Sequence, residues 1–218
     1  MTTVDSSMDG AGRLLDSPGV VIGNHTNKYI AKNPAIRFLT ERWVARLDGF
    51  LDRIGSESSP KRPLEVGAGE GVISQRLHQR FGDATAIDLP DPGLRTEWKT
   101  RPGPRYLHAD AEQLPFRDGE FDLTVCVEVL EHLVDPHRGL AELARVTSSH
   151  LLVSVPREPI FRACNLVAGR YVTDLGNTPG HFNHWSTRSF LRFLSAAGRV
   201  RAVSKPFPWT VAWVQVAR

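Results

Sequence analysis

The sequence predicts an α/β fold, a doubly wound and mainly parallel seven-stranded sheet with an antiparallel hairpin at one edge. Short β-rich runs alternate with helical patterns from Pro63 onward, and such alternation places a buried parallel sheet between two layers of helices. The first run ends in a glycine-rich turn, "VGAGEG", at the position where sheets of this kind bind ligands. The last two runs are joined only by the turn "KPFPW", which predicts the edge hairpin.

The seven candidate strands are rich in β-branched and other apolar residues. They are the runs "PLEVG" (63–67), "DATAIDL" (83–89), "RYLHAD" (105–110), "FDLTVCVEV" (121–129), "HLLVSVP" (150–156), "RVRAVS" (199–204) and "TVAWVQV" (210–216). Helical patterns are expected between the first five strands, with "VISQRLHQRF" after the first and "DPHRGLAELARV" after the fourth. The segment "STRSFLRFLSAAG" predicts a further helix that begins at an N-cap serine, Ser186, and ends at Gly198.

The chain is expected to divide into a flexible N-terminus, a helical cap and one core domain. Residues 1–20 are rich in Ser, Gly and Asp and offer little to bury, which predicts flexibility. Apolar residues recur at helical spacing after Tyr29, so residues 21–58 should form a cap of one or two helices, and "GSESSPKRP" (55–63) should be a loop. The core then spans residues 59–218, with a lid insertion at about residues 157–183 after the fifth strand.

Composition and charge exclude several classes of partner. The net charge is only +3 and the basic residues are scattered, whereas nucleic-acid binding needs a basic face or stripe, so no nucleic-acid partner is expected. No apolar run approaches the roughly 18 residues of a membrane span, and the N-terminus lacks the apolar centre of a signal peptide, so the protein is expected to be cytoplasmic. Cys126 and Cys164 are expected to serve packing, and no metal site is expected.

The turn "LEVGAGEGVIS" (64–74) carries three glycines, namely Gly67, Gly69 and Gly71. A dinucleotide-binding turn has the spacing G-x-G-x-x-G, and its third glycine would fall where this chain has Val72. Glu65 and Glu70 flank the turn, and carboxylates there would repel a pyrophosphate by about 4 kcal/mol at ~4 Å in a partly screened site. The acids therefore favour a cationic ligand; the alternative is that the turn is only a tight connection.

Acidic residues follow the next two strands. Asp88 in "AIDLP" lies about 20 residues after the first glycine, where an acidic residue at a strand tip accepts the hydroxyls of a ribose. Asp110 in "HADAEQLPF" stands at the same edge of the predicted sheet. A turn-forming aspartate explains either residue alone but not both at these offsets, so the ligand is expected to carry a nucleoside.

The run from Leu64 to Leu133 resembles the class I S-adenosylmethionine-dependent methyltransferases, in particular the broad group that includes the ubiquinone and menaquinone methyltransferases. The resemblance covers about residues 60–218 and rests on the combined spacing of "LEVGAGEG", "AIDLP", "ADAEQLPF" and "FDLTVCVEVLEHL". It implies a Rossmann-like methyltransferase fold, with S-adenosylmethionine as the cofactor and S-adenosylhomocysteine as its product. This cofactor has a sulfonium and an ammonium but no phosphate, which accounts for the acids around the turn.

The resemblance also implies how the cofactor is held. Glu65 and the backbone of the turn would hold the methionine part, and Glu128 would face its end. Asp88 would accept the ribose hydroxyls, Leu89 would pack on the adenine, and Asp110 with the next backbone N–H would read the adenine edge. The implied cofactor-binding residues are Glu65, Gly67, Ala68, Gly69, Gly71, Asp88, Leu89, Asp110, Ala111 and Glu128.

Two histidines are candidate catalytic residues. Methyl transfer is an in-line displacement that needs a base only when the acceptor is an alcohol, a phenol or a similar acid. His132, in "LEHL" directly after the fourth strand, is the first candidate for that base, and a structural role in the turn is the alternative. His181 in "GHFNHWS" is the second; its spacing from His184 would suit a metal only on a helix, and the neighbouring glycine and asparagine predict a loop.

The acceptor is expected to lie between the N-terminal cap and the lid insertion. The lid mixes apolar residues with arginines, which permits an acidic or phosphorylated acceptor, and the alternative for His184 is to cap the helix that follows. The candidate substrate-binding residues are Tyr29, Arg157, Arg162, His184 and Trp185.

The favoured function is O-methylation of a small molecule, namely a metabolite, a sugar or a lipid-linked intermediate. The segment "VEVLEHL" lacks the asparagine- or aspartate-Pro-Pro-aromatic motif typical of methyltransferases that act on bases and glutamine amines. C-methylation of a quinone-like ring and N-methylation of a small amine stay open. So do an RNA methyltransferase and a non-catalytic binding module with this fold.

Overall fold

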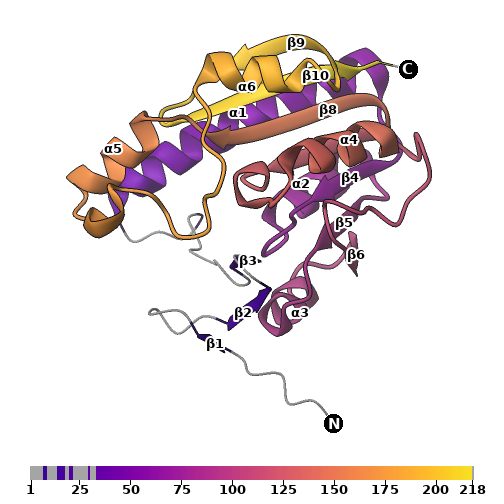
Figure 1. Ribbon diagram of the computed structural model, residues 1–218. Helices are drawn as coiled ribbons and strands as arrows, with labels where there is room; N and C mark the ends of the chain where they lie inside the picture. Colours follow the sequence, from indigo (N-terminus) through magenta and orange to yellow (C-terminus); the bar gives the residue numbers. More distant parts are fainter. Residues whose placement is uncertain (1–6, 9–13, 18–19, 22–28, 30–32, 218) are drawn as a thin grey trace.

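The structure is a computed structural model that describes residues 7–8, 14–17, 20–21, 29 and 33–217. At its centre lies a seven-stranded sheet in the order β6-β5-β4-β7-β8-β10-β9 (Figure 1). Its strands are β4 (Pro63–Val66), β5 (Thr85–Asp88), β6 (Arg105–His108), β7 (Phe121–Val127), β8 (Thr147–Pro156), β9 (Gly198–Ser204) and β10 (Trp209–Val216). Each of them coincides with one of the seven runs in the sequence.

The sheet is parallel from β6 through β8, and β10 pairs antiparallel with both β8 and β9. The predicted fold class, a mainly parallel seven-stranded sheet with an antiparallel edge hairpin, is therefore confirmed. The chain passes from β4 to β5 and β6 on one side and then returns to β7 on the other. The strand order reverses between β4 and β7, and doubly wound sheets bind ligands beyond the carboxyl ends of their strands at this point.

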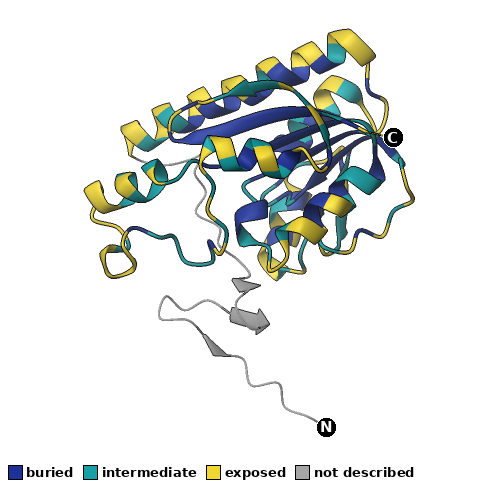
Figure 2. Cartoon of the chain, turned by 45° about the horizontal axis from the view of Figure 1, so that its top comes forward, coloured by how far each residue is buried: buried dark blue, intermediate teal, exposed yellow. Residues whose placement is uncertain are grey.

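Helices cover both faces of the sheet, and the central strands are buried between them (Figure 2). On one face α1 (Pro34–Ser58) and α2 (Val72–Phe81) share a core with β7 and β10, to which Trp43 and Leu77 contribute. On the other face α4 (Pro136–Val146) and α6 (Thr187–Leu194) share a core to which Leu143 and Phe190 contribute. The remaining helical elements are α3 (Pro92–Lys99), η2 (Leu130–His132), α5 (Ile160–Val167) and η3 (Val172–Asp174).

Capping residues fix where helices begin. The Asn33 side chain accepts hydrogen bonds from the N–H groups of Ala35 and Ile36, and Pro34 occupies the first turn of α1, where its missing N–H costs nothing. The Ser186 hydroxyl accepts from the N–H of Ser189 at 3.2 Å, so the predicted N-cap of α6 is confirmed.

Three local predictions are wrong. Helix α1 is a single helix that continues to Ser58, so the first part of "GSESSPKRP" is helical; the fully buried Ile54 packs the last turns onto the core. Helix α6 ends at Leu194, and Gly198 instead opens β9, where a side chain would collide with the Gln215 carbonyl of β10. Strands β6 and β7 are connected by residues 109–120, among which no helix occurs.

The N-terminal part is described only in pieces. The strands β1 (Ser7–Met8), β2 (Leu14–Ser17) and β3 (Val20–Val21) form a second, antiparallel sheet. Most of residues 1–20, for which flexibility is expected, lie outside the described residues, and the domain boundaries stay predictions. Among the helices of the described part, none is long and apolar enough to cross a membrane.

Candidate active site

The glycine-rich turn lies at the carboxyl end of β4, where the strand order reverses. Its glycines Gly67, Gly69 and Gly71 have φ angles of 80°, 49° and 84°, left-handed values that only glycine adopts without strain. A side chain at Gly67 would collide with Val129, and one at Gly71 would collide with the Tyr106 hydroxyl. A side chain at Gly69 would meet nothing within 4 Å. The outer glycines thus permit close packing, and the middle one leaves open space where a ligand can approach the backbone.

Asp88 ties this turn to the end of β5. Its carboxylate accepts hydrogen bonds from the N–H of Gly69 at 2.7 Å and from the N–H of Leu89 at 2.8 Å. The N–H of Ala68 donates to the Ile87 carbonyl at 2.9 Å. The structure therefore brings together the turn and the two residues expected to contact ribose and adenine.

Glu65 lies in β4 below the turn, and only 1% of its surface is exposed. Burial raises the pKa of Glu65 well above its usual range; a hydrogen bond from the Ser74 hydroxyl offsets part of this, and the charges of Asp88 and Glu70 raise the pKa further. A positively charged ligand would stabilise the charged forms of Glu65, Glu70 and Asp88 together. The electrostatics of the turn thus suit an ammonium or a sulfonium.

Asp110 and Ala111 lie just past β6, at the same edge of the sheet. One carboxylate oxygen of Asp110 accepts a hydrogen bond from the backbone N–H two residues later, at 2.8 Å, so the aspartate also shapes its own turn. Helix α4 holds the segment that follows: Glu142 accepts from the N–H of Leu114 at 2.8 Å, and Arg145 donates to the Leu114 carbonyl at 3.0 Å. The expected adenine-reading turn is thus fixed by α4.

Glu128 stands just past β7 with a φ angle of 59°, a left-handed value that is strained for a non-glycine residue. Its carboxylate accepts a hydrogen bond from the Trp209 indole N–H at 2.6 Å and lies 3.5 Å from the Ser154 hydroxyl. The Trp43 indole N–H donates to the same hydroxyl at 2.9 Å. Contacts from α1, β8 and β10 therefore hold the carboxylate that is expected to face the methionine end.

A chain of aromatic contacts leads from the N-terminal cap to the lid. The ring-centroid distances are 6.3 Å for Tyr29–Trp43, 5.5 Å for Trp43–Trp209, 6.1 Å for Trp209–Phe161, 5.9 Å for Phe161–His181 and 4.7 Å for His181–His132. Burial raises the pKa of Tyr29 well above its usual range, and the charges of Glu65, Glu70 and Glu128 raise it further. The phenol of the cap therefore keeps its proton and lies near the carboxylates of the expected cofactor site.

His132 and His181, far apart in sequence, come together with their rings nearly perpendicular at 83°. Glu131, which is 1% exposed, lies beside them: a carboxylate oxygen of Glu131 and one ring nitrogen of each histidine all lie within 4.8 Å of one another. Nδ1 of His132 lies 2.9 Å from the Gly180 carbonyl oxygen. A carbonyl only accepts, so Nδ1 carries the proton and Nε2 of the neutral ring keeps its lone pair. The absence of a metal site stays a prediction.

The end of the lid is fixed against η2 by backbone hydrogen bonds. The N–H groups of Phe182 and Asn183 donate to the Glu131 carbonyl at 2.8 and 3.1 Å. The Asn183 amide donates to the carbonyls of Leu130 and Leu133 at 3.2 and 2.7 Å. The histidine that precedes this pair is thereby held in place beside η2.

The two predicted lid arginines differ in their contacts. Arg162 Nε donates to the Leu175 carbonyl at 3.2 Å, which braces the lid internally. Arg157 Nε is buried and has no hydrogen-bond partner among the described residues. Of the two, Arg157 has more capacity left for an anionic group.

His184 and Trp185 take part in packing at the end of the lid. The exposed His184 ring lies 2.7 Å from Asn177 Oδ1. The Trp185 ring packs on Phe190 and Phe193 of α6, with centroids 5.7 and 5.3 Å apart. Their contact with an acceptor stays a prediction.

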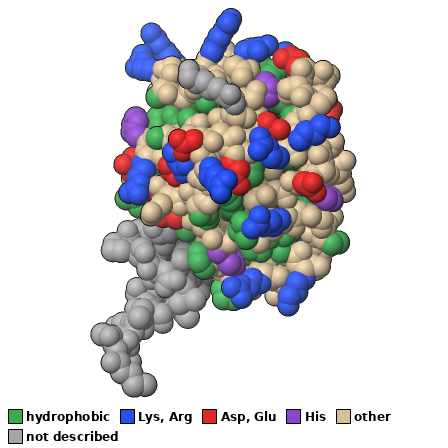
Figure 3. All heavy atoms as spheres, turned by 90° about the vertical axis from the view of Figure 1, so that its right-hand side faces the viewer, with side chains coloured by type: hydrophobic (Ala, Val, Ile, Leu, Met, Phe, Trp, Pro, Cys, Tyr) green, Lys and Arg blue, Asp and Glu red, His purple; other side chains and the backbone are tan. Residues whose placement is uncertain are grey.

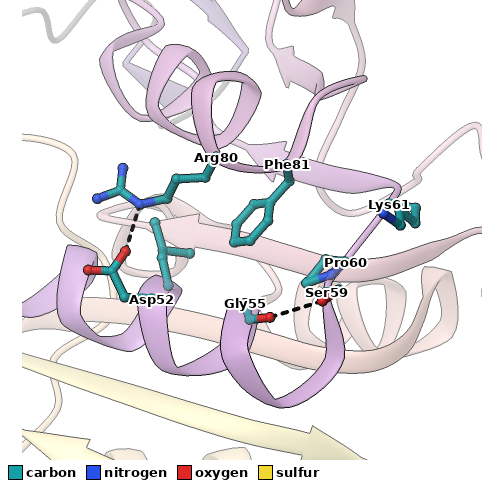
Figure 4. A pocket seen from close by; sticks show the side chains of 8 residues that line it. Asp52, Gly55, Ser59, Pro60, Lys61, Arg80 and Phe81 are labelled. Atoms are coloured by element: carbon teal, nitrogen blue, oxygen red, sulfur yellow. Dashed lines mark hydrogen bonds and ion pairs between the residues drawn. The ribbon is translucent and has the colours of Figure 1, made fainter.

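A surface hollow of about 420 Å³ lies near the amino end of β4, whereas the glycine-rich turn lies at its carboxyl end (Figure 4). It is formed by the C-terminal ends of α1 and α2, and Arg80 in its wall donates to Asp52 at 3.0 Å. Doubly wound sheets bind ligands at the carboxyl ends of their strands, whereas this hollow adjoins the amino end of β4. It is therefore separate from the candidate active site.

Comparison with known families agrees with this geometry. A family model described as "Methyltransferase domain" matches residues 64–151, which run from β4 into β8 and include every predicted cofactor-binding residue. Residues 64–151 therefore carry a methyltransferase domain. S-adenosylmethionine is the cofactor that this assignment indicates, as the sequence predicts.

Two curated relatives show how far the similarity extends. The chain is 28% identical over 149 residues to the ubiquinone biosynthesis O-methyltransferase of Bordetella avium, covering 65% of this chain and 59% of the relative. It is 31% identical over 135 residues to the demethylmenaquinone methyltransferase of Renibacterium salmoninarum, covering 61% of this chain and 55% of the relative. The aligned part thus spans little more than half the length of these relatives.

Among solved structures, the methyltransferase fold is matched by the magnesium protoporphyrin IX methyltransferase of Synechocystis PCC 6803, which contains S-adenosylhomocysteine. The TM-score is 0.66 at 14% identity, and the match covers 87% of this chain and 91% of that protein. At this identity the likeness shows the fold alone.

Several contributing residues escape sequence reasoning. Trp98 of α3 donates to the Gly69 carbonyl at 2.8 Å and Trp209 donates to Glu128, yet these pairs lie 29 and 81 residues apart, so no local pattern links them. Glu131 is different, because it stands beside the candidate base in "LEHL". Its place in the sequence was a signal that could have identified it.

Proposed function

We propose that this protein transfers a methyl group from S-adenosylmethionine to a hydroxyl group of a small molecule. The single observation that carries the proposal is the orientation of His132, whose Nδ1 is bound to the Gly180 carbonyl at 2.9 Å. In this tautomer Nε2 is the ring nitrogen that carries a lone pair, and His132 stands just past the carboxyl end of β7. A hydroxyl oxygen becomes a strong nucleophile only as its proton is removed by a base, whereas a neutral amine attacks without losing a proton first.

The residues of the site would divide the work as follows. When bound, S-adenosylmethionine supplies an electrophilic methyl group on a sulfonium. Glu65 and Asp88 would orient the cofactor on the turn, and Glu128 would face its methionine end. His132 Nε2 would take the hydroxyl proton while the acceptor oxygen bonds to the methyl carbon and the carbon–sulfur bond breaks, which would leave S-adenosylhomocysteine. Alignment and proton removal are thus the tasks of the protein.

The acceptor would lie between the cap and the lid, beside the chain of aromatic contacts from Tyr29 to His181. These rings favour an acceptor with an apolar or ring-bearing body over a small polar one. Arg157, with its buried Nε, would receive a carboxylate or phosphate on that acceptor. One of the two relatives above is by name an O-methyltransferase, which agrees with transfer to oxygen.

Two alternatives make different predictions. An RNA methyltransferase would need a basic surface, and on the face drawn in Figure 3 lysines and arginines are mixed with acidic residues rather than gathered into a stripe. A non-catalytic module would bind the cofactor without turnover. An N-methyltransferase of a small neutral amine would not depend on His132 as a base, and a C-methyltransferase would place the methyl group on carbon rather than on oxygen.

The test is methyl transfer from tritiated S-adenosylmethionine to a panel of phenols, alcohols, amines and RNA. We expect counts in a hydroxyl acceptor, and His132→Gln should lower kcat by about 10²- to 10⁴-fold with cofactor affinity almost unchanged. His137→Gln, an exposed histidine of α4, is the matched control and should keep full activity. Transfer to amines or RNA alone, or an equal loss of cofactor affinity in His132→Gln, would contradict the proposal.

A further inference from the structure

We infer that Glu131 is a positioning residue whose buried carboxylate orients the His132–His181 pair and stabilises its protonated form. The inference rests on the proposed function and goes beyond it, because it names the group that sets the basicity of the catalytic site. Glu131 is neither one of the residues expected to bind the cofactor nor one of the two histidines expected to act as the base.

The three side chains lie close together in a buried place. A carboxylate oxygen of Glu131 and one ring nitrogen each of His132 and His181 all lie within 4.8 Å of one another. Glu131 is 1% exposed and His181 is 8% exposed, so water screens their interaction little. A carboxylate at this distance from an imidazole favours the imidazolium over the neutral ring.

Glu131 also joins the two segments that carry the histidines. Its backbone belongs to η2 together with His132. Its carbonyl accepts the N–H groups of Phe182 and Asn183, which follow His181 directly. The backbone of Glu131 therefore fixes the relative position of the two rings, and its side chain lies among them.

The proposed reaction places a positive charge on the histidine pair. As the acceptor O–H bond breaks, its proton forms a new N–H bond at His132 Nε2 and the imidazole gains a positive charge. A buried cation without a counter-charge is costly. The carboxylate of Glu131 lies beside the two histidine rings and supplies that counter-charge, as a buried carboxylate does for the histidine of a hydrolase triad.

Other titratable groups pack around the pair and must be considered. On β7, burial raises the pKa of the Cys126 thiol well above its usual range and the charge of Glu131 raises it further, so the thiol stays neutral. Glu128 is bound by the Trp209 indole, and the Phe161 ring contacts both that indole and His181. On the connection from β8 to α5 the charged groups are Arg157 and Glu158.

The test is an NMR titration of the histidine rings in ¹⁵N-histidine-labelled protein, without cofactor or acceptor. Signals are assigned with His132→Gln and His181→Gln. We expect Glu131→Gln to lower the titration midpoint of the pair by about one pH unit, a tenfold change in proton affinity, and Glu131→Asp to restore most of it. Glu41→Gln, an exposed carboxyl of α1, is the matched control and should change nothing.

The outcomes separate this inference from the proposed function, because the titration needs no methyl transfer. Unchanged midpoints in Glu131→Gln would overturn it. If Glu131→Gln does not fold, the wild-type titration decides: midpoints at or below about 6.5, the ordinary histidine value, would overturn the inference, and higher ones support it. A titration that appears only after treatment with a chelator would indicate a bound metal instead and would also overturn it.

For an active enzyme the same change has a kinetic signature. Glu131→Gln should move the acidic limb of the kcat profile to lower pH by about one unit and lower the plateau, because the base becomes weaker. The Kd for S-adenosylmethionine should stay the same. A purely structural role would instead lower cofactor affinity and kcat together at every pH.

Discussion

The cofactor edge and the acceptor edge of this site are built in different ways. At the cofactor edge, Asp88 contacts Gly69 and Leu89, partners that lie 19 and 1 residues away in sequence. At the acceptor edge, His132 contacts Gly180 over 48 residues, and Asn183 contacts Leu130 and Leu133 over 53 and 50 residues. The first edge is made of short strand-turn motifs, whereas the second forms only when the lid folds back onto η2 after β7.

This difference indicates which parts of the chain determine selectivity for the cofactor and which determine selectivity for the acceptor. Turn geometry and local carboxyl groups define the cofactor site, so one strand-turn-helix unit carries most of its chemistry. The acceptor site depends on contacts among α1, the lid and β10, each of which can vary without disturbing the turn. Changes at the two edges should therefore have separable effects, which the following experiments examine.

Loss of Asp88 should have the largest effect at the cofactor edge. Asp88→Ala removes an anion that accepts two backbone hydrogen bonds and is expected to bind the ribose. Hydrogen bonds to charged groups are worth about 1.5–3 kcal/mol each, so cofactor affinity should fall about a hundredfold by calorimetric titration. Asp91→Ala, which removes the N-cap of α3, is the matched control and should leave affinity intact; a loss of less than threefold in Asp88→Ala would contradict the assignment.

Two glycines of the turn should respond in opposite ways. Gly67→Ala forces a side chain into Val129 at positive φ and should destabilise the fold by about 3 kcal/mol in urea unfolding. Gly69→Ala meets open space and should cost only about 1 kcal/mol, yet it should weaken cofactor binding because the new methyl occupies the ligand's approach. Equal stability losses, or an unimpaired cofactor affinity in Gly69→Ala, would show that the turn does not contact the ligand.

Cofactor binding should depend on pH through Glu65. Its pKa is raised in the free protein, mainly by burial, and a bound cation favours the carboxylate, so binding should release a proton and affinity should rise with pH by up to tenfold per unit. The stability of the free protein depends on pH in the opposite direction. Protonated Glu65 contributes its full stabilisation of the fold below the ordinary carboxyl pKa, and this contribution is lost as the pH rises through the raised pKa of the folded state.

Calorimetry in two buffers of different ionisation enthalpy measures that proton directly. Glu65→Gln should abolish the proton release and flatten the dependence of affinity on pH. Proton uptake on binding in the wild-type protein would contradict the proposed cationic ligand.

The smallest effects are expected at the lid arginines. Arg157→Ala should raise KM for an anionic acceptor about fivefold, in keeping with about 1 kcal/mol for a partly exposed ion pair. Arg162→Ala should mainly loosen the lid, since its Nε already donates to Leu175, and should leave KM within twofold. If neither change alters KM, the lid does not recognise an anionic group.

The same contrast explains how far the sequence alone predicts the structure. The seven strands, the turn and Asp88 follow from runs and spacings of a few residues, where local geometry dominates. The composition of "GSESSP" predicts a loop, whereas burial of Ile54 extends α1 into this segment. The position of Gly198 predicts a helix end, whereas in the structure this glycine lets β9 approach β10.

Within the site, the pairing of His132 with His181 was not predictable from spacing, although both residues were candidates. Their meeting depends on Asn183, whose amide binds two carbonyls around η2 across 53 and 50 residues. Glu131 stands beside His132 in "LEHL", but the sequence does not show that its side chain is buried next to His181.

The decisive measurement is calorimetric titration of the protein with S-adenosylmethionine, S-adenosylhomocysteine and NAD. The acidic turn predicts micromolar binding of the two adenosyl compounds and no binding of NAD, whose pyrophosphate would meet Glu65 and Glu70. Binding of NAD, or silence from all three ligands, would contradict the central claim that this turn holds a cationic adenosyl cofactor.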